Sequence, residues 1–167
     1  MSAVPVDAAY ATRARGTGEK VDWHRTLQWM GAFTTSIQVR FGHVDPAGIV
    51  YFPRIYDYIH EVFEEVWERH VDVRYYKILC EDHVGFPLVH SEVDFKHPLH
   101  FGDHPEVRVT CFKLGKSSLG LRYLFRVGDV ECVDARMVTA CIDLTAQRSI
   151  AMPERYRRAF ESIREEA

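Results

Sequence analysis

The sequence predicts an α+β domain in which one long helix is wrapped by an antiparallel sheet. Apolar residues recur at three- and four-residue steps from Pro53 to His70, which is the spacing of one helix face. Alternating apolar and polar residues mark one strand before this helix and about four strands after it. Short turns join the later strands, and such connections favour antiparallel neighbours.

Composition limits the classes of function. The 167 residues suffice for one domain with a core of ordinary size. A net charge of −3 gives no basis for nucleic-acid binding, and no apolar run approaches the ~20 residues that cross a membrane. The N-terminus lacks the charged and then apolar pattern of a secretion signal. The four cysteines include no Cys-x-x-Cys pair and favour a reducing cytoplasm.

The chain begins with residues 1–22, which are rich in Ala, Gly, Thr and charge and show no apolar period. We expect them to form a mobile tail. The apolar residues of 23–30 are spaced for a short helical turn that Gly31 ends. A single folded domain is therefore expected over residues 23–167.

The first strand and the long helix flank a turn. Residues Phe33 to Phe41 alternate as a half-buried strand does. Its inward side chains are expected to be Phe33, Thr35, Ile37, Val39 and Phe41. The turn Asp45-Pro46-Ala47-Gly48 breaks the strand, and Pro53 suits the first helical turn because it has no N–H. The inward helix stripe is expected to be Ile55, Ile59, Val62, Phe63, Val66 and Trp67.

The rest of the chain supplies the sheet. The segment from Arg74 to Val84 favours a short helix or a loop. Strands are predicted at Phe86–Phe95, Glu106–Phe112, Leu119–Val127 and Val130–Ile142. Turns are predicted at Leu114–Ser117 and at Gly128–Asp129. An amphipathic helix from Pro153 to Arg164 is expected to bury Tyr156, Phe160 and Ile163.

Asp45 is the candidate catalytic group that the residues themselves indicate. It lies in a turn that leads into a helix, and the first N–H groups of a helix have no internal acceptor. Pro53 has no N–H, so Tyr51 and Phe52 are the last residues before it that can donate. A carboxylate beside such donors could act on a carbonyl while the helix end holds the developing charge.

The run Phe41-Gly-His-Val-Asp-Pro-Ala-Gly-Ile-Val-Tyr-Phe-Pro53 resembles the hotdog-fold acyl-CoA thioesterases of the 4-hydroxybenzoyl-CoA thioesterase type. The resemblance extends from about Phe33 to Ile150. It implies a hotdog fold, pairing of two copies with active sites at their interface, and commonly a tetramer. It also implies that Asp45 is catalytic, as nucleophile or general base, and that the Phe52 N–H polarises the thioester carbonyl. This chemistry needs no metal and no redox cofactor.

The same resemblance suggests substrate-binding residues. By ungapped count from Asp45, His60 takes the helix position that lies near the ring hydroxyl of a hydroxybenzoyl group. Gly48 would let the substrate approach the backbone, and Phe86 would line the acyl pocket. Lys116, with Lys113 nearby, takes the place of basic residues near the CoA phosphates.

Two rivals to aromatic acyl-CoA hydrolysis remain open at this point. Hotdog hydratases and dehydratases move protons with an Asp/His pair, for which Asp57 and His60 are the nearest match. A non-catalytic acyl-CoA or acyl-carrier binding protein could use the same fold. The histidines at positions 97, 100 and 104 lack the Cys partners or helical pairing of a zinc site, so we expect no metal.

Overall fold

The computed structural model describes residues 31–165. Both the predicted tail, residues 1–22, and most of the predicted turn at 23–31 lie outside this range. Within the described part, no helix is long and apolar enough to span a membrane.

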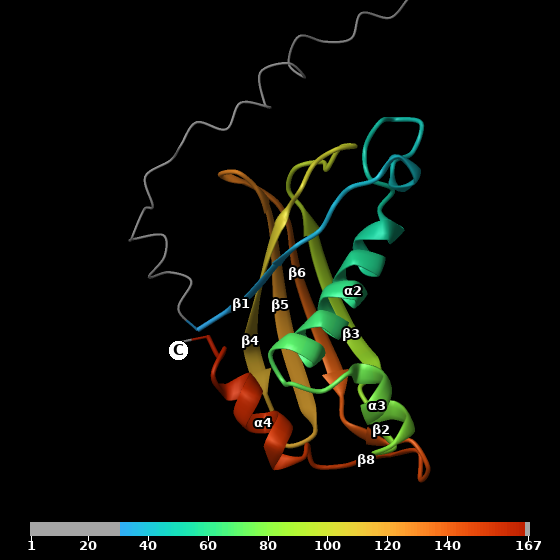
Figure 1. Ribbon diagram of the computed structural model, residues 1–167, viewed down its shortest axis with the longest axis vertical. Helices are drawn as coiled ribbons and strands as arrows, with labels where there is room; N and C mark the ends of the chain where they lie inside the picture. The colour runs from blue at the N-terminus through green and yellow to red at the C-terminus, as the bar shows by residue number, and fades with distance from the viewer. Residues whose placement is uncertain (1–30, 166–167) are drawn as a thin grey trace, which may run out of the picture. The chain divides into compact units, whose positions relative to one another are not determined.

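A five-stranded antiparallel sheet forms one layer of the domain (Figure 1). The strand order is β1-β4-β5-β6-β3. The strands are β1 (Phe33–Ser36), β3 (Leu88–Phe95), β4 (Glu106–Leu114), β5 (Ser118–Val127) and β6 (Val130–Ala140). The predicted meander is confirmed, because β4, β5 and β6 are hydrogen-bonded neighbours. Strand β3 forms an edge of this sheet and pairs with β6 alone.

Helix α2 (Pro53–Arg69) lies across one face of the sheet (Figure 1). The predicted inward stripe is confirmed, and one further residue of the helix is also buried, Tyr58 at 1% exposure. The stripe packs against the inward faces of the central strands, where Val107, Cys111 and Leu119 have no exposed surface. One apolar core between helix and sheet therefore holds the start of α2 in a fixed position.

Shorter elements close the end of the domain opposite the Asp45 turn. They are α3 (Tyr75–Cys80), β2 (Val84–Gly85), β7 (Ile142–Asp143), β8 (Arg148–Ser149) and α4 (Glu154–Glu161). The ambiguous segment before Val84 is thus helical in part. In α4 and its C-terminal flank, Tyr156, Phe160 and Ile163 are buried as predicted. The last long strand is shorter than expected, ending at Ala140.

The first strand corrects one prediction. Its ladder with β4 ends at Ser36, although Ile37 and Val39 stay buried and donate backbone hydrogen bonds to Pro105 and Asp103. Phe41 does not face inward: it is 79% exposed. The alternation fails there because the 3₁₀ helix η2 (Phe41–His43) begins and rotates the backbone out of the extended conformation.

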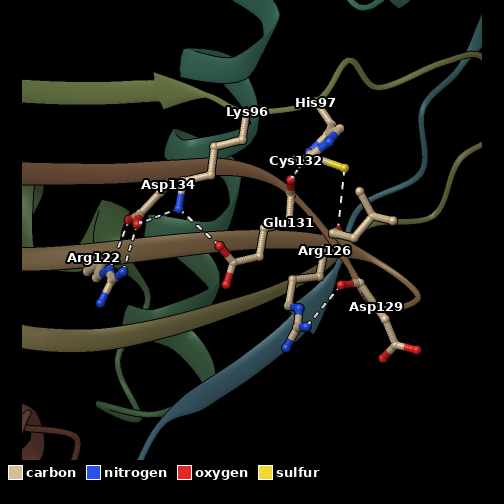
Figure 2. Close-up of polar contacts among 9 residues, drawn as sticks. Lys96, His97, Arg122, Arg126, Asp129, Glu131, Cys132 and Asp134 are labelled. Atoms are coloured by element: carbon tan, nitrogen blue, oxygen red, sulfur yellow. Dashed lines mark hydrogen bonds and ion pairs between the residues drawn. The ribbon is translucent and has the colours of Figure 1, made fainter.

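A polar network on the outer face of the sheet joins the end of β3 to β5 and β6 (Figure 2). The Asp134 carboxylate accepts two hydrogen bonds from the Arg122 guanidinium, at 2.9 and 2.7 Å. Lys96, the residue after β3, reaches Glu131 at 3.0 Å and Asp134 at 3.5 Å. Hydrogen bonding to Arg122 holds the pKa of Asp134 below its ordinary value. The network therefore fixes the position of the chain where it leaves the edge strand.

Candidate active site

The turn that carries Asp45 is a small hairpin. The Asp45 N–H donates to the Ile49 carbonyl and the Gly48 N–H donates to the Asp45 carbonyl, each at 2.9 Å. An antiparallel bridge between Val44 and Val50 closes it. Gly48 has a φ of +79°, in the left-handed region that favours glycine, so the turn itself accounts for this residue.

The Asp45 side chain is half-buried and held by its own turn. Its Oδ1 accepts a hydrogen bond from the Ala47 N–H at 2.8 Å, which leaves Oδ2 without a partner among residues 31–165. The carboxylate borders a cavity of about 450 Å³. The other lining residues are Ile49, Val50, Phe52, Ile55, Phe95, Lys96, His97, Pro98, Leu99 and Val133. A carboxylate oxygen is thus available at the wall of a largely apolar cavity.

Phe52 lines the same cavity and carries a backbone N–H at the start of α2. Phe52 is the N-cap of α2, and its N–H has no acceptor within the described range 31–165. Tyr51, the second predicted donor, differs: its N–H donates to the His43 carbonyl at 3.0 Å. Because the Tyr51 N–H is hydrogen-bonded across the turn, the Phe52 N–H is the available one of the two predicted donors at the positive end of the helix dipole.

A buried tyrosine ties the helix to the segment before the turn. The Tyr58 hydroxyl lies 2.7 Å from Nδ1 of His43, and the Arg40 N–H lies 3.2 Å from the same nitrogen. A backbone N–H can only donate, so Nδ1 is an acceptor and the ring proton of the neutral imidazole lies on Nε2. Burial raises the pKa of Tyr58 to about 12, which keeps its hydroxyl a neutral donor.

A second cavity, of about 360 Å³, lies between α2 and the sheet. Two predicted substrate residues, His60 and Phe86, line it. The other lining residues are Tyr56, Ile59, Phe63, Tyr75, Pro87, Leu88, Leu119, Leu121, Tyr123, Met137 and Thr139. The His60 side chain is 63% exposed and its Nε2 lies 3.1 Å from Glu64. This cavity is apolar within and polar at its entrance.

The two cavities lie at opposite ends of the edge strand β3. Phe95, at the end of the strand, lines the cavity of Asp45, whereas Leu88, at its start, lines the cavity of His60. They share no lining residue. Within one chain, Asp45 and Phe52 therefore lie at one cavity, whereas His60 and Phe86 lie at the other.

The two predicted CoA-binding lysines are exposed. Lys113 lies near the end of β4 and Lys116 lies in the hairpin before β5. The start of β5 also supplies Leu119 to the cavity of His60. The β4–β5 hairpin that carries the lysines lies at the end of the sheet opposite the start of α2 (Figure 1).

Sequence reasoning missed two residues beside the turn that carries Asp45. Tyr58 continues the apolar stripe three residues after Ile55, so its position in the helix could have predicted that it is buried. Lys96 places an ammonium-bearing side chain in the wall of the Asp45 cavity. Its partners Glu131 and Asp134 lie on another strand, and no local pattern indicates them.

The sheet topology with its central helix defines a hotdog fold, and similarity to known thioesterases makes the chain a thioester hydrolase. The family model of the thioesterase-like superfamily matches residues 39–160, and the chain belongs to that family. A 1,4-dihydroxy-2-naphthoyl-CoA hydrolase of Nostoc punctiforme is 29% identical over 136 residues, which cover 81% of this chain and 91% of the relative.

Solved structures agree with this assignment. A 1,4-dihydroxy-2-naphthoyl-CoA thioesterase from Synechocystis superimposes with a TM-score of 0.71 at 26% identity, over 78% of this chain and 96% of the other. A gentisyl-coenzyme A thioesterase superimposes with a TM-score of 0.69 at 25% identity, over 77% of this chain and 99% of the other. The acyl groups of these two enzymes, dihydroxynaphthoyl and gentisyl, are both oxygenated aromatic groups.

Proposed function

We propose that the enzyme hydrolyses an aromatic acyl-CoA thioester to the free acid and CoA, with Asp45 and the Phe52 N–H at the reacting carbonyl. One observation carries the proposal: Asp45 and Phe52 line the same cavity, and within residues 31–165 neither the Asp45 Oδ2 nor the Phe52 N–H has a hydrogen-bond partner. The similarity to hydrolases of naphthoyl and gentisyl thioesters supports an aromatic acyl group.

The Phe52 N–H would donate to the thioester oxygen as negative charge develops there. One such donor is typically worth about 3 kcal/mol of barrier. Asp45 would either attack the carbonyl carbon, expelling the CoA thiolate and leaving an anhydride for water to open, or take a proton from a water that attacks instead. Both routes consume one water, place a proton on the departing sulfur and yield the same acid.

The complete site would require two copies of the chain. Strand β3 is an edge strand, and Leu88, Val89 and Phe95 are all more than half exposed along it. If two β3 strands pair antiparallel, the Leu88 end of one copy lies beside the Phe95 end of the other. The Asp45 cavity of one copy then meets the His60 cavity of its partner, and the thioester spans the junction. A tetramer would join two such dimers.

The lysines fit this arrangement. In an antiparallel dimer, the hairpin with Lys113 and Lys116 lies at the same end as the acyl cavity of its own copy, and hence near Asp45 of the other. Exposed ammonium groups at that entrance would attract the phosphates of CoA.

The hydratase alternative gains little support from the helix. Asp57 lies on an exposed face and pairs with Arg54 at 2.9 Å, and neither residue lines the cavities of Asp45 and His60. A protein that only binds acyl-CoA would not need an unpartnered carboxylate oxygen beside a donor at the helix end.

A matched pair of variants tests the function. We expect the wild type to release free CoA from aryl-CoA thioesters faster than from long fatty acyl-CoA, and Asp45→Asn to reduce this release by at least about 100-fold. Asp57→Asn is the control, since it removes a carboxylate of the same size outside the cavity. Thermal melting of both variants checks the fold.

Each rival has its own outcome. Full hydrolysis by a folded Asp45→Asn protein would refute the role of Asp45. Loss of hydration activity in Asp57→Asn, without effect in Asp45→Asn, would favour the hydratase. Tight acyl-CoA binding with no free CoA released by the wild type would favour the binding protein.

A further inference from the structure

The hydroxyl of Tyr123 stands apart from the other polar groups of the acyl cavity. Tyr123 lies at the centre of β5, opposite Val109 on one neighbour and the small Ala135 on the other. It is 1% exposed and lines the cavity of His60. Its ring is enclosed by the core, and the little surface that it keeps faces the cavity.

Its hydroxyl has no protein partner in the described part of the chain. Among residues 31–165, every fully enclosed side-chain oxygen has a hydrogen-bond partner. The Tyr123 oxygen takes part in no hydrogen bond within this range, so it is not fully enclosed. The small accessible surface of Tyr123 therefore includes this oxygen, which a molecule in the cavity can reach.

Of the other hydroxyls around the cavity, that of Tyr56 belongs to a side chain that is 38% exposed, and the remaining two have protein partners. The Tyr75 hydroxyl accepts the Phe86 N–H at 3.3 Å, and the Thr139 hydroxyl donates to the Leu119 carbonyl at 3.3 Å. An enclosed hydroxyl without a partner costs free energy, so its presence in an apolar wall calls for a ligand group that satisfies it. Burial raises the pKa of Tyr123, which keeps the group a neutral donor.

We infer that Tyr123 is a specificity-determining residue, whose hydroxyl donates a hydrogen bond to an oxygen on the aromatic acyl group in this cavity. The inference rests on the proposed function and narrows its substrate class to ring-oxygenated aryl-CoA thioesters. A ring without that oxygen leaves the enclosed hydroxyl unsatisfied, and polar sites of this kind reject such analogues strongly. The His60 side chain is too exposed to impose the same free-energy cost on a ring that lacks the oxygen.

The test compares Tyr123→Phe with the wild type on benzoyl-CoA and the three monohydroxybenzoyl-CoA isomers. We expect the wild type to favour at least one isomer over benzoyl-CoA in kcat/KM, and Tyr123→Phe to reduce that preference by about 10- to 100-fold through the hydroxylated substrate alone. Tyr76→Phe makes the same chemical change at a 72% exposed site and should leave the preference unaltered.

A melting experiment gives a readout that needs no turnover. The free hydroxybenzoate should raise the Tm of the wild type more than benzoate does, and this difference should vanish in Tyr123→Phe. The unliganded variant should melt no lower than the wild type, since it loses no protein partner. Equal stabilisation by both acids in the wild type, or a lower Tm of the unliganded variant, would overturn the inference. Absence of hydrolysis across the panel, with the ligand shifts retained, would count against the proposed function alone.

Discussion

The Tyr58 hydroxyl on helix α2 lies 2.7 Å from Nδ1 of His43, the last residue of the 3₁₀ helix before the Asp45 turn. The His43 carbonyl in turn accepts the Tyr51 N–H at 3.0 Å, on the other side of that turn. One histidine thus joins the helix, the incoming chain and the outgoing chain. The contact connects the rigid core to the segment that carries Asp45.

Tyr58→Phe tests whether this contact positions the carboxylate. The ring keeps its packing, but the turn loses its tie to the helix, so we expect kcat to fall about 10-fold or more with KM little changed. The free energy of unfolding should fall by only about 1 kcal/mol. Steady-state kinetics and urea unfolding measure the two effects. A kcat equal to that of the wild type, with reduced stability, would limit Tyr58 to a structural role.

Phe52→Pro removes the helix-end donor without adding a side-chain charge. Phe52 has a φ of −53°, which a proline ring can adopt, and its N–H makes no hydrogen bond within residues 31–165. We expect a folded protein whose kcat is about 100- to 1000-fold lower. Phe52→Ala is the control, because it removes the ring but keeps the N–H. Equal losses in the two variants would assign the effect to the ring.

Asp134→Asn probes the outer network of the sheet. Losing the paired hydrogen bonds to Arg122 should lower the free energy of unfolding by about 2 kcal/mol at pH 7. Arg122 lowers the pKa of Asp134 in the folded state, so its stabilisation is complete above the ordinary value of 3.8 and is lost as pH falls through the lowered pKa. The difference between the two proteins should therefore shrink below about pH 4.

Urea unfolding at several pH values measures this difference. Glu154→Gln is the control, because Glu154 forms an exposed pair with Arg158 that should contribute less than about 0.5 kcal/mol. A constant difference between wild type and Asp134→Asn from pH 7 to pH 3 would contradict the assignment.

Val89→Lys tests the edge-strand dimer. Val89 is 59% exposed and lies at a shift in the β3–β6 register, so the substitution should disturb a single chain little. Two β3 strands pairing antiparallel would gain repelling charges near their junction. We expect the molar mass from light scattering to fall and turnover per chain to fall with it. Tyr76→Lys, at an exposed site on α3, is the control; an unchanged mass in Val89→Lys would argue against pairing through β3.

Local patterns predicted much of the fold. The stripe of α2 and the alternation around Val107 and Cys111 depend on near neighbours in the sequence, and their burial is confirmed. The prediction that Phe41 faces inward was wrong. An alternating pattern indicates which way a strand residue faces, but it does not indicate where the strand ends. The 3₁₀ helix that begins at Phe41 carries no strong sequence signal.

The site was predictable only as far as it is local. Asp45 and Phe52 are seven residues apart and border one cavity, as the turn-to-helix reading suggested. The hydrogen bond from the Tyr51 N–H to the His43 carbonyl depends on the bridge between Val44 and Val50. The identities of single residues do not predict that bridge. Likewise, alternation predicted the strand that carries Tyr123, but only the packing of neighbouring strands determines whether its hydroxyl has a partner.

Under the proposed function, the separation of the two cavities along β3 places the reacting groups at one end of the strand and the groups that select the acyl chain at the other. A substitution at Met137 or Thr139 changes the lining of the His60 cavity but not the lining of the Asp45 cavity. The acyl preference can therefore drift while the hydrolytic step is preserved.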